Sequence, residues 1–164
     1  MSSLDTEVRN VQNPAFGAIM LAAFVEGFYE ADEKKRGVPL PYLFLVLPLI
    51  LHSDIFRLLS STRTSLRNMA EKFVSTESAG TDLLLSINSS ALRLRELTAE
   101  SLGILFLAGL AKMDPKKGVV LPRKSIEFAS RLDLPCEAEE SRKLGKWFAP
   151  LSPFEIGSIL KVIF

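Results

Sequence analysis

Residues 38–52 read VPLPYLFLVLPLILH, an apolar run that contains Pro39, Pro41 and Pro48 and has no charged side chain before its end. About 14 apolar residues are too few for a bilayer-spanning helix, which needs roughly 20. We therefore expect a segment that is buried on all sides. Because proline lacks an amide hydrogen and clashes with the preceding helical turn, Pro48 should start or kink a helix rather than lie in its middle.

The length and composition of the whole chain favour a single domain, part of whose surface is covered by a partner subunit. A chain of 164 residues can bury its own core without metals or disulfides. The sequence is 48% hydrophobic with a mean hydropathy of +0.22. This apolar excess favours a surface that a partner subunit covers. We expect a loose arm over residues 1–12 and a single domain over residues 13–164.

The remaining pattern predicts a mainly α fold. Asn13 and Pro14 suit the N-cap and first position of an apolar helix over residues 15–29. Further helices are predicted over residues 54–59, 65–75 and 82–94, over 99–110 with Thr98 as its cap, and over 136–148, with a helical turn at 125–132. The final helix begins at a capping box formed by Ser152 and Glu155.

Three finer expectations concern packing. One face of the helix over residues 65–75 should be buried, and the final helix should bury a stripe of isoleucine and leucine. Gly103 and Gly109 fall inside a helical pattern, where glycine allows close packing. The members of the two faces are Leu66, Met69, Ala70, Phe73 and Val74, and Ile156, Ile159, Leu160 and Ile163.

Residues 82–121 predict two helices followed by a β-hairpin, whose strands lie at residues 110–113 and 119–121 around the turn DPKKG. This order is typical of a winged helix-turn-helix, in which a recognition helix runs into a hairpin wing. However, the helix over residues 99–110 carries a single charge, Glu100. A helix that reads DNA would need more polar and basic side chains to contact bases and phosphates.

Charge limits how the chain could contact nucleic acid. Twenty basic and nineteen acidic residues leave a net charge of +1, so any contact must come from a local patch. Two candidate patches contain Arg63, Arg67 and Lys72, and Lys116, Lys117, Arg123 and Lys124. For both patches, an ordinary solvated helix face or turn is the alternative interpretation.

The sequence offers no catalytic or metal-binding constellation. One cysteine and one histidine lie far apart, and no glycine-rich phosphate loop is present. His52, Ser53 and Asp54 are the residue types of a hydrolase triad, but neighbours in sequence do not face each other on a helix. We expect Ser53 or Asp54 to cap the next helix and His52 to be hydrogen-bonded locally. The predictions are therefore no enzyme, no cofactor, no membrane segment and, without a signal peptide, a cytoplasmic protein.

Three blocks, NPAFGA at residues 13–18, GVPLPYLFLVLPLILH at 37–52 and LGKWFAPLSPFEI at 144–156, resemble one known family in content and order. This family comprises the middle components of prokaryotic three-component ABC systems. The middle block is the most specific. The matching positions, most of which suit capping, chain direction or core packing, are Asn13, Pro14, Gly17, Pro39, Leu47, Pro48, His52, Gly145, Trp147 and Phe148.

The resemblance implies a non-catalytic adaptor that couples an SMC/Rad50-like ABC ATPase subunit to a further component. Such systems are thought to act against phage or other foreign DNA, or in DNA repair. DNA contact would then be indirect or through a weak basic patch. The alternative is a DNA-binding winged-helix regulator that acts as a dimer. The adaptor and the regulator require different surfaces: an adaptor needs an apolar area on which a partner can bind, and a regulator needs a basic helix that contacts DNA.

Overall fold

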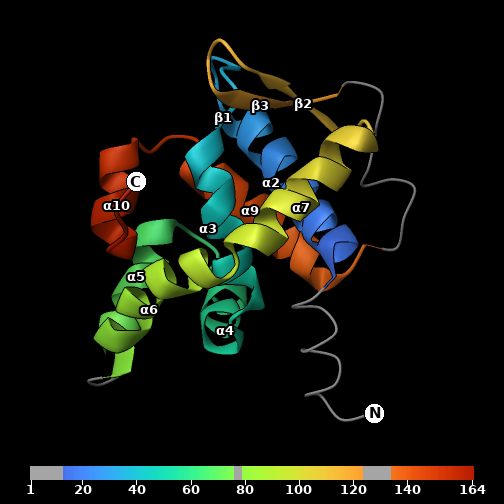
Figure 1. The fold of residues 1–164 in the computed structure, drawn as a ribbon. Coiled ribbons are helices and arrows are strands. Elements are labelled where there is room, and N and C mark those ends of the chain that lie inside the picture. The colour runs from blue at the N-terminus through green and yellow to red at the C-terminus, as the bar shows by residue number, and fades with distance from the viewer. Residues whose placement is uncertain (1–12, 76–78, 124–133) are drawn as a thin grey trace.

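The computed structural model of the chain describes residues 13–75, 79–123 and 134–164 (Figure 1). Within these ranges the protein is mainly helical, as predicted, with a small antiparallel sheet. The predicted arm at residues 1–12 and the predicted helical turn at 125–132 lie outside the described residues. The elements are α2 (Pro14–Ala31), β1 (Val38–Pro39), α3 (Leu40–Leu51), α4 (Ser53–Ser61), α5 (Leu66–Ser75), α6 (Ala79–Arg93), α7 (Arg95–Leu107), β2 (Ala111–Asp114), β3 (Val119–Pro122), α9 (Cys136–Phe148) and α10 (Pro153–Leu160).

Helix α2 begins where the sequence predicts and runs through the middle of the molecule between α7 and α9 (Figure 1). The Asn13 side chain accepts hydrogen bonds from the amides of Ala15 (3.0 Å) and Phe16 (3.3 Å), and Pro14 occupies the first helical position. A helix that is apolar on nearly every side must be covered on every side. The surrounding helices supply that cover.

Helices α2 and α9 approach each other at glycines. A Cβ atom on Gly27 would overlap the carbonyl oxygen of Arg142, and one on Gly145 would overlap the carbonyl oxygen of Phe24. Because the obstacles are backbone atoms, neither position can accept a side chain unless the helices move apart. The two glycines therefore set the distance between α2 and α9.

Two buried serines continue this close packing along α2. The Ser141 hydroxyl on α9 donates a hydrogen bond to the carbonyl oxygen of Met20 at 2.7 Å. On α7, the Ser101 hydroxyl donates to the carbonyl oxygen of Leu97 at 2.7 Å and lies where a Cβ atom on Gly17 would fall. Small residues thus bring both neighbours against the α2 backbone, with their hydroxyls hydrogen-bonded.

The run at residues 38–52 forms β1 and α3, and the expected burial is confirmed. Pro48, however, lies inside α3 rather than at its start. A proline there removes one helical hydrogen bond, at a cost of about 3 kcal/mol in a helix interior. Tertiary burial of the surrounding side chains offsets that cost, and the helix ends three residues later at Leu51. The buried residues of α3 are Tyr42, Leu43, Leu45, Val46, Leu47, Pro48, Leu49 and Ile50.

The chain turns by 95° between α3 and α4 at His52. Neither Ser53 nor Asp54 caps α4, so that prediction is wrong: His52 occupies the N-cap position, and Asp54 pairs with Arg57 at 3.2 Å. The expected local hydrogen bond of His52 is also wrong at Nδ1: this atom is buried without a hydrogen-bond partner among the described residues, and the side chain makes no capping hydrogen bond to α4. In these ranges no single helix is long and apolar enough to cross a membrane; only the bent pair of α3 and α4 reaches that length.

The predicted helices at residues 65–75 and 82–94 are confirmed as α5 and α6. On α5 the predicted face is buried except for Val74, which is 64% exposed at the last turn. Helix α7 begins at Arg95, so Thr98 lies inside it instead of capping it. The Thr98 hydroxyl donates to the carbonyl oxygen of Leu94 at 3.0 Å, which satisfies it within the helix.

The expected packing role of two glycines is also wrong. Gly103 on α7 faces open space, with no heavy atom within 4 Å of a Cβ built there. Gly109 follows the end of α7 and has φ +69°, a left-handed conformation that favours glycine where the chain turns towards β2.

Strands β2 and β3 form the predicted hairpin, with Lys112 opposite Leu121 and Met113 opposite Val120. The two-residue strand β1 was not predicted. It pairs Val38 with Val120 and gives the strand order β1-β3-β2. The sheet is thereby joined to the start of α3.

The last two helices match the sequence prediction. In the capping box of α10, the Ser152 amide donates to the Glu155 carboxylate at 2.8 Å and the Glu155 amide donates to the Ser152 hydroxyl at 3.3 Å. Helix α10 ends at Leu160 because Lys161 has φ 57°. Ile163, predicted on the buried stripe, therefore lies beyond the helix and is 90% exposed.

The helix contact can be tested with two glycine substitutions. Gly145→Ala should lower the free energy of unfolding by about 1–3 kcal/mol, because its methyl group overlaps the α2 backbone. The control Gly103→Ala should raise it by up to about 1 kcal/mol, because alanine is the better helix former at an open position. Urea denaturation followed by circular dichroism measures both. Similar effects of the two substitutions would contradict the close approach of α2 and α9.

Candidate interaction surfaces

Five of the ten family-pattern residues are buried in the core, and of the other five only the helix cap Asn13 is exposed. The Leu47 side chain lies beside Gly17. The Phe148 ring packs edge-on against the rings of Phe24 and Tyr42, with centroid distances of 5.3 and 5.7 Å. Such pairs stabilise a core. These positions of the pattern therefore specify packing, and binding surfaces must be sought elsewhere.

Trp147, also in the pattern, belongs to a contact between α9 and α4. The Lys143 ammonium lies 5.2 Å from the Trp147 ring centroid and donates hydrogen bonds to the carbonyl oxygens of Leu59 (2.8 Å) and Thr62 (3.0 Å). It also pairs with Glu140. A cation at these last carbonyls caps α4 and offsets its dipole. The sequence alone does not predict this role of Lys143, because its partners Leu59 and Thr62 lie 84 and 81 positions earlier in the chain.

The described residues contain no group of three or more His, Cys, Asp or Glu side chains that could hold a metal ion. His52, Ser53 and Asp54 are not brought into a triad, since Asp54 is exposed and paired with Arg57. Partial desolvation and the Glu137 carboxylate, 3.3 Å from the thiol, raise the pKa of Cys136. A raised pKa keeps the thiol protonated and poorly nucleophilic near neutral pH.

An open groove of about 620 Å³ lies between α5, α6 and α10. Buried Ala70 and Leu84 belong to its floor, together with the partly buried Ile159. Two large apolar side chains, Val74 at 64% and Phe154 at 84% exposed, also line it. We call this the α5–α10 groove. The sequence does not predict this groove, because the helical pattern places Val74 on the buried face of α5 and no local signal marks Phe154 as a surface residue of a groove.

The charges around the α5–α10 groove balance. Two basic residues, Arg67 and Lys161, and two acidic residues, Glu71 and Glu155, line it. Hydrogen bonds from the Ser152 amide and hydroxyl lower the pKa of Glu155, so this carboxylate is ionised at neutral pH. A groove with an apolar floor and balanced charges suits apolar side chains of another protein better than a charged ligand.

The wall that α10 forms is tied to the rest of the molecule. The Asn88 side-chain amide donates to the carbonyl oxygen of Lys161 at 3.0 Å. Beyond it, the Phe164 ring lies 5.4 Å from the Tyr42 ring. The chain after α10 thus returns to α6 and to the core, which fixes the position of the groove wall.

The two predicted basic patches lie apart. Arg63 and Arg67 are exposed at α5 and the loop before it, where Lys72 donates to the carbonyl oxygen of Ser61 at 3.1 Å. Lys116, Lys117 and Arg123 belong to the hairpin at another end of the molecule, and Lys124 lies outside the described residues (Figure 1).

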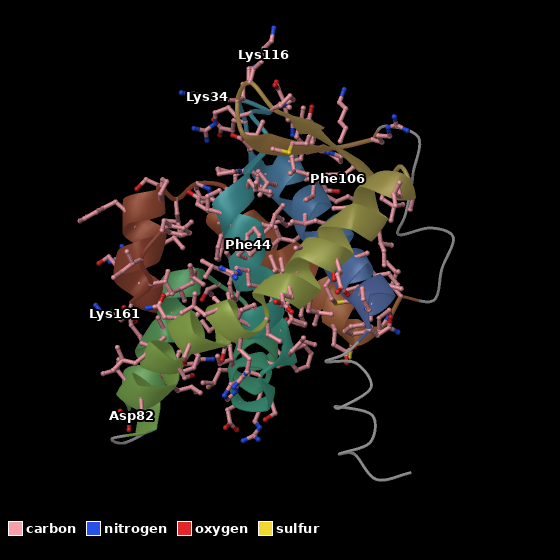
Figure 2. All side chains as sticks on the ribbon, viewed as in Figure 1. Lys34, Phe44, Asp82, Phe106, Lys116 and Lys161 are labelled. Atoms are coloured by element: carbon pink, nitrogen blue, oxygen red, sulfur yellow. The ribbon has the colours of Figure 1, made fainter. Side chains whose placement is uncertain are left out.

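The turn before β1 adds basic side chains to the hairpin end. Figure 2 shows Lys34 and Lys116 at the same end of the molecule, which the sheet forms. Nothing in the sequence predicts this neighbourhood, because it depends on the pairing of β1 with β3.

Asp32 organises that turn. Its carboxylate is 3% exposed and accepts hydrogen bonds from the amides of Lys34 (3.3 Å) and Arg36 (2.7 Å) and from the Arg36 guanidinium (3.1 Å). Burial alone would raise the pKa of Asp32, but the Arg36 side chain and the two backbone amides outweigh it and hold the pKa below its usual value. The ionised carboxylate therefore stabilises the turn.

The order α6, α7, β2, β3 is that of the predicted helix-helix-hairpin unit, and its assignment as a winged helix stays a prediction. The exposed side of α7 has one basic residue, Arg95 at its first position, followed by Glu96, Glu100, Ile104 and Leu107, the last of them 91% exposed. Acidic and apolar side chains are unsuited to phosphate contacts. Helix α7 therefore does not present the surface of a DNA-reading helix.

The chain is thus a small, mainly helical protein with two distinctive surfaces, the apolar α5–α10 groove and the basic end formed by the sheet. The family model "ABC-three component (ABC-3C) system Middle Component 3" matches residues 1–164. The chain belongs to this family, which confirms the resemblance and implies partner components within a multi-component system. No curated protein and no solved structure matches the chain.

The role of Asp32 predicts a pH-dependent effect of Asp32→Asn. At pH 7 the substitution should lower the free energy of unfolding by about 1–3 kcal/mol, because charge-assisted hydrogen bonds are lost. Since the folded-state pKa is depressed, the contribution is complete above the ordinary value of 3.8 and is lost as the pH falls through the folded-state pKa. Urea titrations from pH 7 to pH 3 measure the difference between variant and parent. A difference that does not shrink in acid would contradict this role, and exposed Asp54→Asn is the control.

Proposed function

We propose that the chain is a non-catalytic adaptor that couples an SMC/Rad50-like ABC ATPase to a further component of its system. In this proposal the protein works in the cytoplasm, in defence against phage or other foreign DNA or in DNA repair. Membership of the middle-component family supports a role that depends on partners. The observation that carries the proposal is the α5–α10 groove with its exposed Phe154 and Val74.

The energetics of the groove favour a protein partner. Burying a Phe or Val side chain contributes about 1.5–3 kcal/mol. Aromatic side chains at the centre of an interface often supply much of its binding energy. Phe154 lies beside an apolar floor in which a partner's side chains can pack, as when a helix binds in a groove. We assign the groove to the ATPase subunit, because the adaptor must hold that subunit throughout its cycle.

The alternative, a dimeric DNA-binding regulator, would need basic and polar side chains along α7. Only one exposed residue of α7 is basic, Arg95 at the first helical position, and the exposed side chains after it are acidic or apolar, which favours the adaptor.

The groove predicts the effect of placing charge in it. The double variant Phe154→Asp, Val74→Asp should weaken binding to the SMC/Rad50-like ATPase proposed as the partner by at least about 30-fold, since hot-spot losses reach 2 kcal/mol or more. Calorimetry with the two purified subunits measures the affinity. The double variant Leu92→Asp, Leu107→Asp adds the same charge at exposed apolar positions of α6 and α7 and should bind normally. Full binding by the groove variant, or equal loss by the control, would contradict the assignment.

A further inference from the structure

Positive charge is concentrated at the sheet end of the molecule. The turn and sheet, residues 32–37 and 111–123, contain seven basic and three acidic side chains, a net charge of +4, whereas the whole chain has +1. The rest of the chain therefore has a net charge of −3. The small net charge of the whole chain conceals this uneven distribution of charge. The distribution arises because β1 pairs with β3 and brings the turn beside the hairpin.

Some of these cations serve the fold. The Lys35 ammonium donates to the carbonyl oxygens of Tyr29 (2.6 Å) and Glu30 (3.0 Å) at the end of α2. The Arg36 guanidinium pairs with Asp32 at 3.1 Å. Lys35 and Arg36 still add positive charge to the sheet end, but their side-chain N–H groups already donate hydrogen bonds within the protein.

Five other cations have no such role. They are exposed and form no ion pair with the described residues; we call them the basic face, and they are Lys34, Lys112, Lys116, Lys117 and Arg123.

The hairpin holds part of the basic face in position. The Asp114 carboxylate accepts hydrogen bonds from the amides of Lys116 (3.0 Å) and Lys117 (3.4 Å), so it shapes the turn and leaves both ammonium groups unpaired. Lys112 lies opposite Leu121 in the ladder, next to the pair of Met113 with buried Val120. Because side chains alternate along a strand, Lys112 points to the face of the sheet opposite Val120, away from the core.

We infer that the basic face binds the phosphate backbone of double-stranded nucleic acid without sequence preference. Flexible lysines act as point charges that can each neutralise a phosphate. The described face offers no exposed aromatic ring on which unpaired bases could stack, so a duplex fits better than a single strand. An acidic protein is a poorer occupant, because stable protein interfaces use large apolar anchors. In the described hairpin the one exposed large apolar side chain is Met113, which pairs with Val120 and so lies on the other face of the sheet from Lys112. This activity is separate from the proposed function, since the α5–α10 groove lies on other elements.

Fluorescence anisotropy of the full chain with labelled duplexes of about 20 base pairs and two unrelated sequences tests the inference. Equal affinity for both is expected. The logarithm of the association constant should fall against the logarithm of the salt concentration with a slope of about −4, because each neutralised phosphate contributes about −0.9. No binding at 50 mM salt, a strong preference between sequences, or tighter binding of poly-glutamate than of duplex would overturn it.

Matched variants test the location. The triple variant Lys34→Glu, Lys116→Glu, Lys117→Glu should weaken duplex binding at least tenfold and reduce the size of the slope by about 3. The control Arg57→Glu, Arg93→Glu, Arg95→Glu makes the same change in net charge at exposed positions of other helices, and its affinity for the duplex should stay within about threefold of the parent's. Equal weakening in both would overturn the assignment to the basic face. If the charge reversal prevents folding, as circular dichroism would show, Lys112→Gln with Lys116→Gln removes two charges more mildly and should reduce the slope by about 2.

Discussion

The contact between α2 and α9, where Gly27 and Gly145 let one backbone lie against the other, is the constraint on which the rest of the fold depends. It places Phe148 against Phe24 and Tyr42, so α9 closes the core around α3. The same helix carries Lys143 to the end of α4. A larger residue at either glycine would disturb all of these contacts together, because packed helices cannot separate locally without losing their neighbours.

This arrangement explains why the family pattern points to the fold and not to a binding site. The pattern residues form caps, turns and core contacts around α2, α3 and α9. The surfaces suited to interaction contain none of the ten matching positions: they are the α5–α10 groove on one side and the basic face at the sheet end. In our proposals the groove holds the ATPase and the basic face holds a duplex. Separate surfaces would let one small subunit contact both at once.

Local sequence signals predicted the helices whose ends carry capping residues, and the misses have tertiary causes. Asn13 and the Ser152–Glu155 box fix helix starts through hydrogen bonds within a few residues. Pro48 inside α3 and Thr98 inside α7 depend on burial that overrides local preference. Strand β1 is two residues long and exists only because β3 pairs with it. Both interaction surfaces combine segments distant in sequence, so residue chemistry alone could indicate the hairpin lysines but not Lys34 or the groove.

Hydrogen exchange of the chain, alone and mixed with the ATPase subunit proposed as its partner, tests the adaptor proposal most directly. Slower exchange is expected at residues 66–75 and 153–160, because a partner in the groove would cover α5 and α10 and suppress their local opening. Exchange at residues 14–31 and 136–148 should change little, since α2 and α9 already pack against each other. Unchanged exchange at α5 and α10, with protection centred on α7 instead, would contradict the account.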